Sequence, residues 1–297
     1  MKKSKGFYSG IDRAQYVAMM LPMLAVYIIF TAYPVLGGFY YSITNWNGIN
    51  PVYDIIGLQN FITLFKDPVV LIPLRNTCVY AFFVTIVQNI FALSLAIGLN
   101  TRIKSRNLLR TLIFIPVVLS PLIVGYIWSY IFTEPLTRLG GIIGWQTLHH
   151  NVLGNPRTSL LAGVVVSVWR SVGHTMIIYL AALQAISIEV NEAATVDGAT
   201  GWRKFRYITF PLIAPGFTIN IVLVMEGAFK QFDLMYGLTL GGPGNSSELI
   251  SLTIYRESFE FYRAAYGTAM GVVLFFIICV LSYVGLVVLR RREENVV

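Results

Sequence analysis

Five charged or titratable side chains fall inside apolar stretches of this sequence, where keeping a charge is costly. Arg170 and His174 lie in one stretch, and Glu226, Lys230 and Asp233 lie in the next stretch along the chain. On insertion scales a charge at the centre of a bilayer costs roughly 2.5–3.5 kcal/mol, so such residues usually face a bundle interior or water. These residues therefore indicate either a polar path or structural ion pairs.

Helical spacing sorts the polar residues of the two stretches into faces, because residues three or four apart lie on the same side of a helix. Two candidate path-lining groups result: Ser167, Arg170, Ser171 and His174 in the first stretch, and Val224, Ala228 and Gln231 in the second. The structural alternative is that Arg170 pairs with a carboxylate or a partner subunit and that His174 packs through a hydrogen bond. Glu226 and Lys230 stand four apart with Glu first, the favourable order for an ion pair within one helix. Asp233 lies near enough to the outer end to reach water.

Other chemistries lack their residue patterns. No Gly-x-x-x-x-Gly-Lys-Ser/Thr sequence occurs, so no ATP site of the P-loop type is expected on this chain. The adjacent His149 and His150 have no further ligands at metal spacing and are interpreted as a surface pair. Cys78 and Cys279 each lie in an apolar stretch, so neither a disulfide framework nor a metal cluster is encoded. We therefore expect no cofactor and no metal on this chain.

The composition indicates which kind of element must position these residues. Of 297 residues, 56% are hydrophobic and 12% are charged, whereas an ordinary soluble domain has about a quarter charged residues. Because about 20 apolar residues cross a bilayer, this length accommodates six spans and no large extramembrane domain. The net charge of +8 does not indicate nucleic acid, because the basic residues lie between the apolar runs. We expect one all-α integral membrane domain over residues 1–297.

Six apolar runs are long enough to span a membrane. They cover about 16–41, 77–99, 108–132, 159–185, 212–236 and 266–289. The first is too long for a signal-peptide core and predicts a retained N-terminal helix over about 16–41, and the others predict a core bundle over about 74–290. The absence of an internal sequence repeat argues against an inverted-repeat secondary transporter.

The distribution of basic residues predicts the orientation. Fourteen Lys and Arg residues occur in the two tails and in the connections near residues 102–110 and 203–206, and six occur in the three opposite connections. Because positive residues accumulate on the cytoplasmic side, both termini should lie inside. The outward segments are rich in turn formers, as in Asn45-Trp46-Asn47-Gly48, Gly140-Gly141 and Gly241-Gly242-Pro243-Gly244. They are expected to be ordered caps.

The cytoplasmic connection over residues 186–211 is the most informative segment. It reads Glu192-Ala193-Ala194-Thr195-Val196-Asp197-Gly198-Ala199, followed by eight residues and Ile208-Thr209-Phe210-Pro211. An Ala-rich run with an acidic start predicts a short helix that ends at Gly198. Small alanines leave a low surface that the groove of a partner can approach, and the aromatic and basic residues 202–207 form an amphipathic piece suited to the membrane surface. Without a resemblance, an interfacial helix that links two spans explains the segment.

This spacing resembles the EAA loop of bacterial ABC-importer permeases, which is Glu-Ala-Ala, two residues, Asp-Gly-Ala, eight residues and Ile-x-Leu-Pro. The one departure is Phe210 in place of leucine. Other segments are similar to maltose-type sugar permeases, namely Gly57-Leu58-Gln59-Asn60-Phe61, Phe65-Lys66-Asp67, Tyr179-Leu180-Ala181-Ala182-Leu183-Gln184, and Phe232-Asp233 through Leu238-Thr239-Leu240-Gly241-Gly242-Pro243. The N-terminal third, with Tyr33-Pro34, resembles the first of the two unlike permeases, in its compact glycerol-phosphate or oligosaccharide form.

The resemblance implies a type I ABC-importer permease in a bacterial cytoplasmic membrane. It implies an unlike partner permease, a cytoplasmic ATPase dimer that carries the ATP and Mg, an external solute-binding protein, and a sugar substrate with an oligosaccharide favoured and an acidic sugar possible. It also implies that coupling to the ATPase involves Glu192, Ala193, Ala194, Asp197, Gly198 and Ala199. Substrate contacts are implied on the two helices that flank the EAA loop, and these helices carry the two groups of path-lining residues. Gly241, Gly242 and Pro243 are implied to form an outer loop near the docked binding protein.

Two other classes remain open from the residues. One is a multispanning membrane enzyme that uses His174 or the paired loop histidines, although clustered carboxylates and a metal signature are absent. The other is an ion-coupled secondary transporter that uses Arg170, Glu226 and Asp233.

Overall fold

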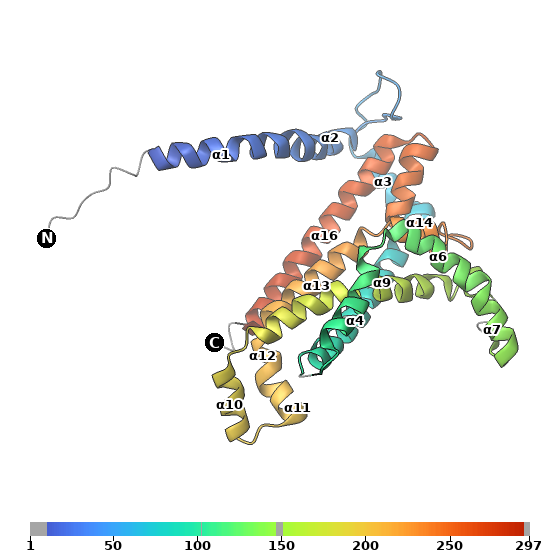
Figure 1. Cartoon of the computed structure of the whole chain (residues 1–297). Helices are drawn as coiled ribbons and strands as arrows, with labels where there is room; N and C mark the ends of the chain where they lie inside the picture. Colours follow the sequence, from blue (N-terminus) through green and yellow to red (C-terminus); the bar gives the residue numbers. More distant parts are fainter. Residues whose placement is uncertain (1–10, 102, 147–150, 294–297) are drawn as a thin grey trace, which may run out of the picture.

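The computed structural model describes residues 11–101, 103–146 and 151–293, so His149 and His150 lie outside the described residues. Helices provide almost all of the regular structure in these ranges (Figure 1). The only β pairing there is an isolated bridge between Thr44 and Ile55. The expected all-α fold is confirmed.

Four helical segments are long and apolar enough to cross a membrane without a sharp bend. The first consists of α1 (Ile11–Tyr27), η1 (Ile28–Ala32) and α2 (Tyr33–Tyr41), which follow one another directly. The other three are α4 (Pro68–Leu99), α9 (Ser159–Gln184) and α16 (Ala264–Glu293). Helix α4 begins earlier than its apolar run predicts. Asp67 explains the early start, because its side chain accepts a hydrogen bond from the Val69 N–H at 2.9 Å and caps the helix.

The third expected span is broken. Its run over 108–132 becomes two helices, α5 (Arg106–Val118) and α6 (Pro121–Thr133), and α7 (Pro135–Ile143) follows. The chain bends by 98° between α5 and the α6–α7 pair. Pro121 explains the break, because the residue before a proline is disfavoured in the helical region, and Ser120 has an extended ψ of 131°. This run is therefore a bent pair of helices with its break at a proline.

The fifth expected span is also divided. Helices α11 (Gly201–Lys204) and η3 (Phe205–Thr209) precede its run, α12 (Phe210–Leu212) leads into it, and a 71° bend at Ile213 separates them from α13 (Ala214–Phe229). The run over 212–236 ends early as a helix, because α13 stops at Phe229 and α14 (Asp233–Leu238) follows separately. Six spans result if each bent pair counts as one span, in agreement with the predicted number.

Short helices lie between the spans. They are α3 (Gln59–Leu64), η2 (Val152–Gly154), α10 (Ile188–Val196), α15 (Ile250–Tyr255) and η4 (Arg256–Glu260). Helix α10 stands at one end of the molecule together with α11, whereas α3, α14 and α15 gather near the other end (Figure 1).

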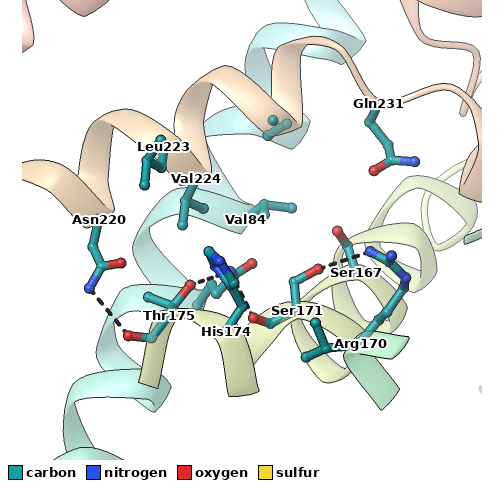
Figure 2. A pocket seen from close by; sticks show the side chains of 14 residues that line it. Val84, Ser167, Arg170, Ser171, His174, Thr175, Asn220, Leu223, Val224 and Gln231 are labelled. Carbon is teal, nitrogen blue, oxygen red and sulfur yellow. Dashed lines mark hydrogen bonds between the residues drawn. The ribbon is translucent and has the colours of Figure 1, made fainter. Parts of the chain in front are cut away.

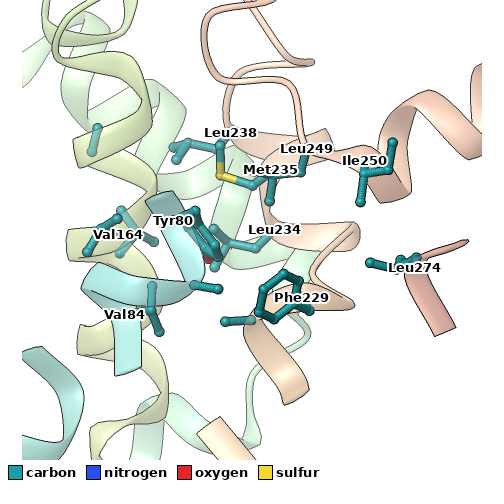
Figure 3. Packing of buried hydrophobic residues seen from close by; sticks show 14 of the residues in the cluster. Tyr80, Val84, Val164, Phe229, Leu234, Met235, Leu238, Leu249, Ile250 and Leu274 are labelled. Carbon is teal, nitrogen blue, oxygen red and sulfur yellow. The ribbon is translucent and has the colours of Figure 1, made fainter. Parts of the chain in front are cut away.

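The packed core joins the central spans. Helix α9 packs along α4 and α5, α13 contacts α4 and α16, and α14 contacts α6. Figure 3 shows the apolar cluster at the centre, in which Tyr80, Phe229 and Met235 are among the buried members. Helices α5 and α9 approach each other closely at Gly173, where an added Cβ atom would lie 2.5 Å from the Ile113 carbonyl oxygen. Only glycine fits this contact.

The N-terminal span stands apart from this core. None of the best apolar window in Gln15–Tyr41 is buried. Helix α1 extends away from the other helices in Figure 1, whereas α2 contacts α16, with the rings of Phe39 and Phe275 5.9 Å apart. Apolar residues such as Met19, Met23 and Phe30 are exposed along it. A helix of this kind is covered by lipid or by another protein in its working environment.

Candidate functional site

All seven residues predicted to line a path border one cavity of about 350 Å³ (Figure 2). Helix α9 supplies four of them and the α13 segment supplies three: Ser167, Arg170, Ser171, His174, Val224, Ala228 and Gln231. The two predicted faces therefore oppose each other across the same space. Whether a substrate passes there stays a prediction.

Arg170 is the one side chain with a permanent charge on the cavity wall. Its Nε donates to the Leu119 carbonyl at 3.3 Å, and its Nη1 donates to the Ser171 hydroxyl at 3.4 Å. None of the ion pairs among the described residues includes it. Within this chain, Arg170 is held by a carbonyl and a hydroxyl, and its charge is not cancelled by a bonded carboxylate.

Sequence reasoning missed three polar residues of the cavity wall, Gln88, Thr175 and Asn220. The Gln88 amide donates to the Thr175 hydroxyl at 2.7 Å, and the Asn220 amide donates to the Thr175 carbonyl at 3.3 Å. The buried Asn220 Oδ1 has no hydrogen-bond partner among the described residues. Both amides lie in apolar stretches, so extending the search from charged to neutral polar side chains would have found them.

The remaining intramembrane charges do not enter this cavity. Lys230 forms an ion pair with Glu226, which confirms the predicted intrahelical pair. Asp233 is exposed at the start of α14, and neither acid lines the cavity. The group that ion coupling would use, namely Arg170 with Glu226 and Asp233, is therefore not assembled at one site.

The predicted coupling segment folds into a helical hairpin. The Ser187 hydroxyl caps α10 by accepting from the Val190 N–H at 3.4 Å. A hydrogen bond from its own backbone N–H, followed by the bond with Ser187, lowers the pKa of Glu189 in the first turn. Gly198 ends the helix with a φ of +71°, and the Ala199 N–H donates back to the Ala194 carbonyl at 2.9 Å. The predicted stop at Gly198 is thus present.

The coupling residues differ in exposure. Glu192, Ala193, Asp197 and Gly198 are exposed, Ala199 is half-buried, and Ala194 is buried at 3%. Val196 is 88% exposed on the open face of α10. Helix α10 therefore leaves Ala193 and Val196 uncovered within the described residues.

An aromatic series connects this hairpin to the membrane part of the chain. The ring centroids of Trp202 and Phe205 lie 5.2 Å apart, those of Phe205 and Phe210 5.9 Å apart, and those of Phe210 and Phe217 5.5 Å apart. The Lys204 ammonium donates to the Asn191 carbonyl at 3.3 Å. The rings therefore form a continuous series of contacts from α11 to α13, and residues of α13 border the cavity.

The predicted outer loop is closed by its own hydrogen bonds. The Gly241 N–H donates to the Thr239 hydroxyl at 3.2 Å, and the Ser247 hydroxyl donates to the Gly242 carbonyl at 2.7 Å. Pro243 accepts from the Ser246 N–H at 3.1 Å. The loop is thus ordered, as the turn formers predict.

Buried charges hold the loop against the outer ends of the spans. The Asn76 amide donates to the Asn245 carbonyl at 3.0 Å, and Arg256 pairs with the buried Glu248 at 2.9 Å. Glu257 is buried and lies 2.5 Å from Arg263. Burial raises the pKa of Glu257, and the charge of Arg263 opposes this change.

Together these features define a polytopic helical membrane protein with a polar cavity between its spans and a small helical hairpin at one end. Residues 88–295 match the family model described as "Binding-protein-dependent transport system inner membrane component". The match covers more than half of the chain, which therefore belongs to this family of non-catalytic transport components. The alternative of a membrane enzyme is set aside.

Individual relatives cover almost the whole chain. The "Probable starch degradation products transport system permease protein" of Thermoanaerobacterium thermosulfurigenes is 36% identical over 98% of each chain. The arabinooligosaccharides transport system permease protein of Bacillus subtilis is 31% identical over 94% of this chain and 89% of its own. A solved bacterial alginate ABC transporter, in complex with an alginate pentasaccharide-bound periplasmic protein, aligns over 97% of this chain and 98% of its own, with 23% identity and a TM-score of 0.83. The structural likeness confirms the ABC-importer permease fold.

Proposed function

We propose that this chain is the permease subunit of an ATP-driven, binding-protein-dependent ABC importer for sugars, with an oligosaccharide as the favoured substrate. It forms half of a heterodimeric translocation path and couples to a cytoplasmic ATPase through the hairpin that contains α10. The observation that carries the proposal is the meeting of all seven predicted path residues at one cavity, on the two spans that flank this hairpin. The starch-product and arabinooligosaccharide relatives support the substrate class.

The cavity wall has the chemistry that a sugar requires. A sugar hydroxyl leaves water at little net cost only if protein donors and acceptors replace its hydrogen bonds. Hydroxyl, amide, imidazole and guanidinium groups face the same space, next to apolar Val224 and Ala228. No carboxylate lines the wall in the described residues, so Arg170 and His174 also leave room for an acidic sugar.

The proposed partners account for surfaces that this chain leaves uncovered. The unlike permease and membrane lipid would cover the apolar α1–α2 segment, and the ATPase dimer, which holds the ATP and Mg, would receive the open face of α10. The external solute-binding protein would dock near Gly241, Gly242 and Pro243. The assembly would lie in a bacterial cytoplasmic membrane, with both termini of this chain inside.

Coupling in this proposal is a shift between two states. The binding protein loaded with sugar and the ATP-bound ATPase each favour one state of the transporter, and a ligand shifts such an equilibrium only by its differential affinity. Helix α10 carries the motion of the ATPase, and the series of contacting rings up to Phe217 transmits it to the cavity wall.

The orientation is testable by single-cysteine labelling. In a background with Cys78 and Cys279 replaced by serine, cysteines at Asn47 and Asn245 should react with a membrane-impermeant maleimide in intact cells, because both belong to predicted outward segments. A cysteine at Thr200 should react only after the membrane is opened. Labelling of Thr200→Cys in intact cells would contradict both the topology and the docking of an ATPase on α10.

The cavity is testable by filling it. Gln231→Phe or His174→Phe should reduce sugar import about tenfold or more, since the variant loses polar contacts of about 0.5–1.5 kcal/mol each and adds bulk in the path. Uptake of radiolabelled maltodextrin or arabinooligosaccharide by cells that express the whole transporter measures the effect.

Val165→Phe is the matched control, because Val165 is exposed on the opposite side of α9 from the cavity. The assembly of all three variants with the ATPase should equal that of the wild type in pull-down experiments. Normal uptake by both cavity variants would make these residues structural and remove the proposed path.

A further inference from the structure

A second cavity, of about 290 Å³, lies at the bend between the cytoplasmic part of the fifth span and its membrane part. Its wall comes from η3, α12, α13 and the last turns of α16, and it shares no residue with the transport cavity. Phe210 and Phe217 of the aromatic series line it, but neither the coupling role nor the proposed path assigns a ligand to this cavity. The cavity lies beside the hairpin end of the molecule, where α12 and the end of α16 come together (Figure 1).

The wall of this cavity is divided into a hydrocarbon part and a cationic part. Phe210, Pro211, Phe217 and Leu289 provide most of the apolar part. Arg206 is the single charged residue that lines the cavity. A ligand that matches both parts must have an anionic head and a hydrocarbon tail.

The charge of Arg206 is uncompensated within the described chain. Its guanidinium carbon lies 5.9 Å from the centre of the Tyr207 ring, and none of the ion pairs among the described residues includes it. One further basic residue, Arg290, is exposed next to Leu289 of the cavity wall. The mouth of the cavity is therefore cationic, and an anion that binds there meets no competing carboxylate on the cavity wall.

The predicted topology places this mouth at the cytoplasmic surface, where anionic phospholipids present their phosphate groups. Basic pockets between spans on this side of a membrane suit such head groups. A free phosphate would leave the apolar wall unused, and an apolar protein segment would leave Arg206 without an anion. The cationic mouth and the apolar wall of the cavity together favour a lipid over a free phosphate and over an apolar protein segment.

We propose that this cavity binds one anionic phospholipid, with its phosphate at Arg206 and an acyl chain between Phe210, Phe217 and Leu289. The lipid holds η3 against α13 and α16 and so braces the base of the coupling hairpin. The proposal rests on the membrane location of the chain and on the predicted inside orientation of the hairpin. It does not depend on the nature of the transported substrate.

Photolabelling of the assembled transporter tests the proposal. The complete complex is placed in nanodiscs that contain a trace of phosphatidylglycerol or phosphatidylcholine, each with the same diazirine-bearing acyl chain, and the labelled peptides are identified by mass spectrometry. Phosphatidylglycerol should label the peptides that contain Phe217 and Leu289 several times more than phosphatidylcholine does. Arg206→Gln should lower this labelling about fivefold, which corresponds to the usual worth of one basic residue at an anionic membrane surface.

Arg203→Gln is the matched control, because it removes the same charge from the same segment without touching the cavity wall. Its labelling should stay near that of the wild type, whereas Ala214→Trp, which fills the slot, should abolish labelling without changing any charge. Equal effects of Arg203→Gln and Arg206→Gln would reduce the site to a diffuse surface charge and overturn the proposal. Competition by inorganic phosphate alone, or labelling that occurs only when the ATPase or partner permease is removed, would also overturn it.

Discussion

Ala193→Trp in helix α10 should leave the permease inserted and paired with its partner but abolish the stimulation of ATP hydrolysis by sugar-loaded binding protein. Ala193 is exposed on α10, so the larger side chain has room in this chain and disturbs only what docks on the helix. Overfilling a packed contact costs about 1–3 kcal/mol, which corresponds to a loss of about fivefold or more in ATPase retention. The measurements are the amount of ATPase in the purified complex and its sugar-stimulated hydrolysis.

The neighbouring alanine does not give the same clean test. Ala194 is buried within the chain, so Ala194→Trp combines a folding defect with any docking defect. Thr101→Trp is a suitable control, since Thr101 is exposed in another predicted cytoplasmic connection, and it should retain the ATPase. Wild-type ATPase retention and stimulation in Ala193→Trp would refute the coupling role of α10.

Two further variants test the backbone shape and the charge of α10 separately. Gly198→Trp should reduce coupling through backbone strain, because Gly198 has a φ of +71° and a Cβ atom there would meet no other atom within 4 Å. Glu192→Lys reverses the charge on the open face of α10, where a basic group of the ATPase is expected. Normal coupling in both variants would count against a shaped and charged contact surface on this helix.

Gly173→Ala should strongly destabilise the membrane bundle, although glycine to alanine usually stabilises a helix. The added methyl group would lie 2.5 Å from the Ile113 carbonyl oxygen and 3.0 Å from the Phe114 Cα, both of which belong to the backbone of α5. Backbone atoms cannot move aside as a flexible side chain can, so α5 and α9 must separate. We expect a cost of about 1–3 kcal/mol and a fall in the yield of folded protein.

Gly98→Ala is the control, and its expected effect on stability is the opposite of that of Gly173→Ala. Gly98 also lies within a helix, but a Cβ atom there would meet nothing within 4 Å. Alanine at this position should therefore be neutral or stabilise the helix by up to about 1 kcal/mol. Thermal denaturation in detergent, followed by fluorescence-detected size-exclusion chromatography, compares the two variants. Equal midpoints would contradict the close approach of α5 and α9.

The coupling hairpin was predictable in detail because its determinants are local. A run of alanines predicts α10 and Gly198 predicts its end, since both depend only on the backbone preferences of neighbouring residues. The predicted start at Glu192 was wrong, because Ser187 caps the helix and α10 begins at Ile188. The burial of a residue, in contrast, does not depend on its neighbours in sequence alone. The sequence treats Ala193 and Ala194 alike, and only the fold buries one of them.

The cavity was predictable in part. Helical periodicity placed Arg170 and His174 on one face of α9 and Gln231 on the facing segment, and the structure brings these faces together. The amides of Gln88 and Asn220 escaped notice because a neutral polar side chain gives a weak signal within an apolar run. Their role depends on Thr175, which each of them reaches from a different helix.

The sequence by itself determined the membrane class, the six apolar runs, the family resemblance and the position of the coupling helix, because hydropathy and motif spacing are properties of short segments. Only the tertiary structure decided that two of the runs bend, by 98° and 71°, and that α5 meets α9 at Gly173. It also decided which polar residues share a cavity. The break at Pro121 has a local cause, whereas the contact of α5 with α9 and the shared cavity arise between segments far apart in the chain, whose geometry depends on how whole helices pack.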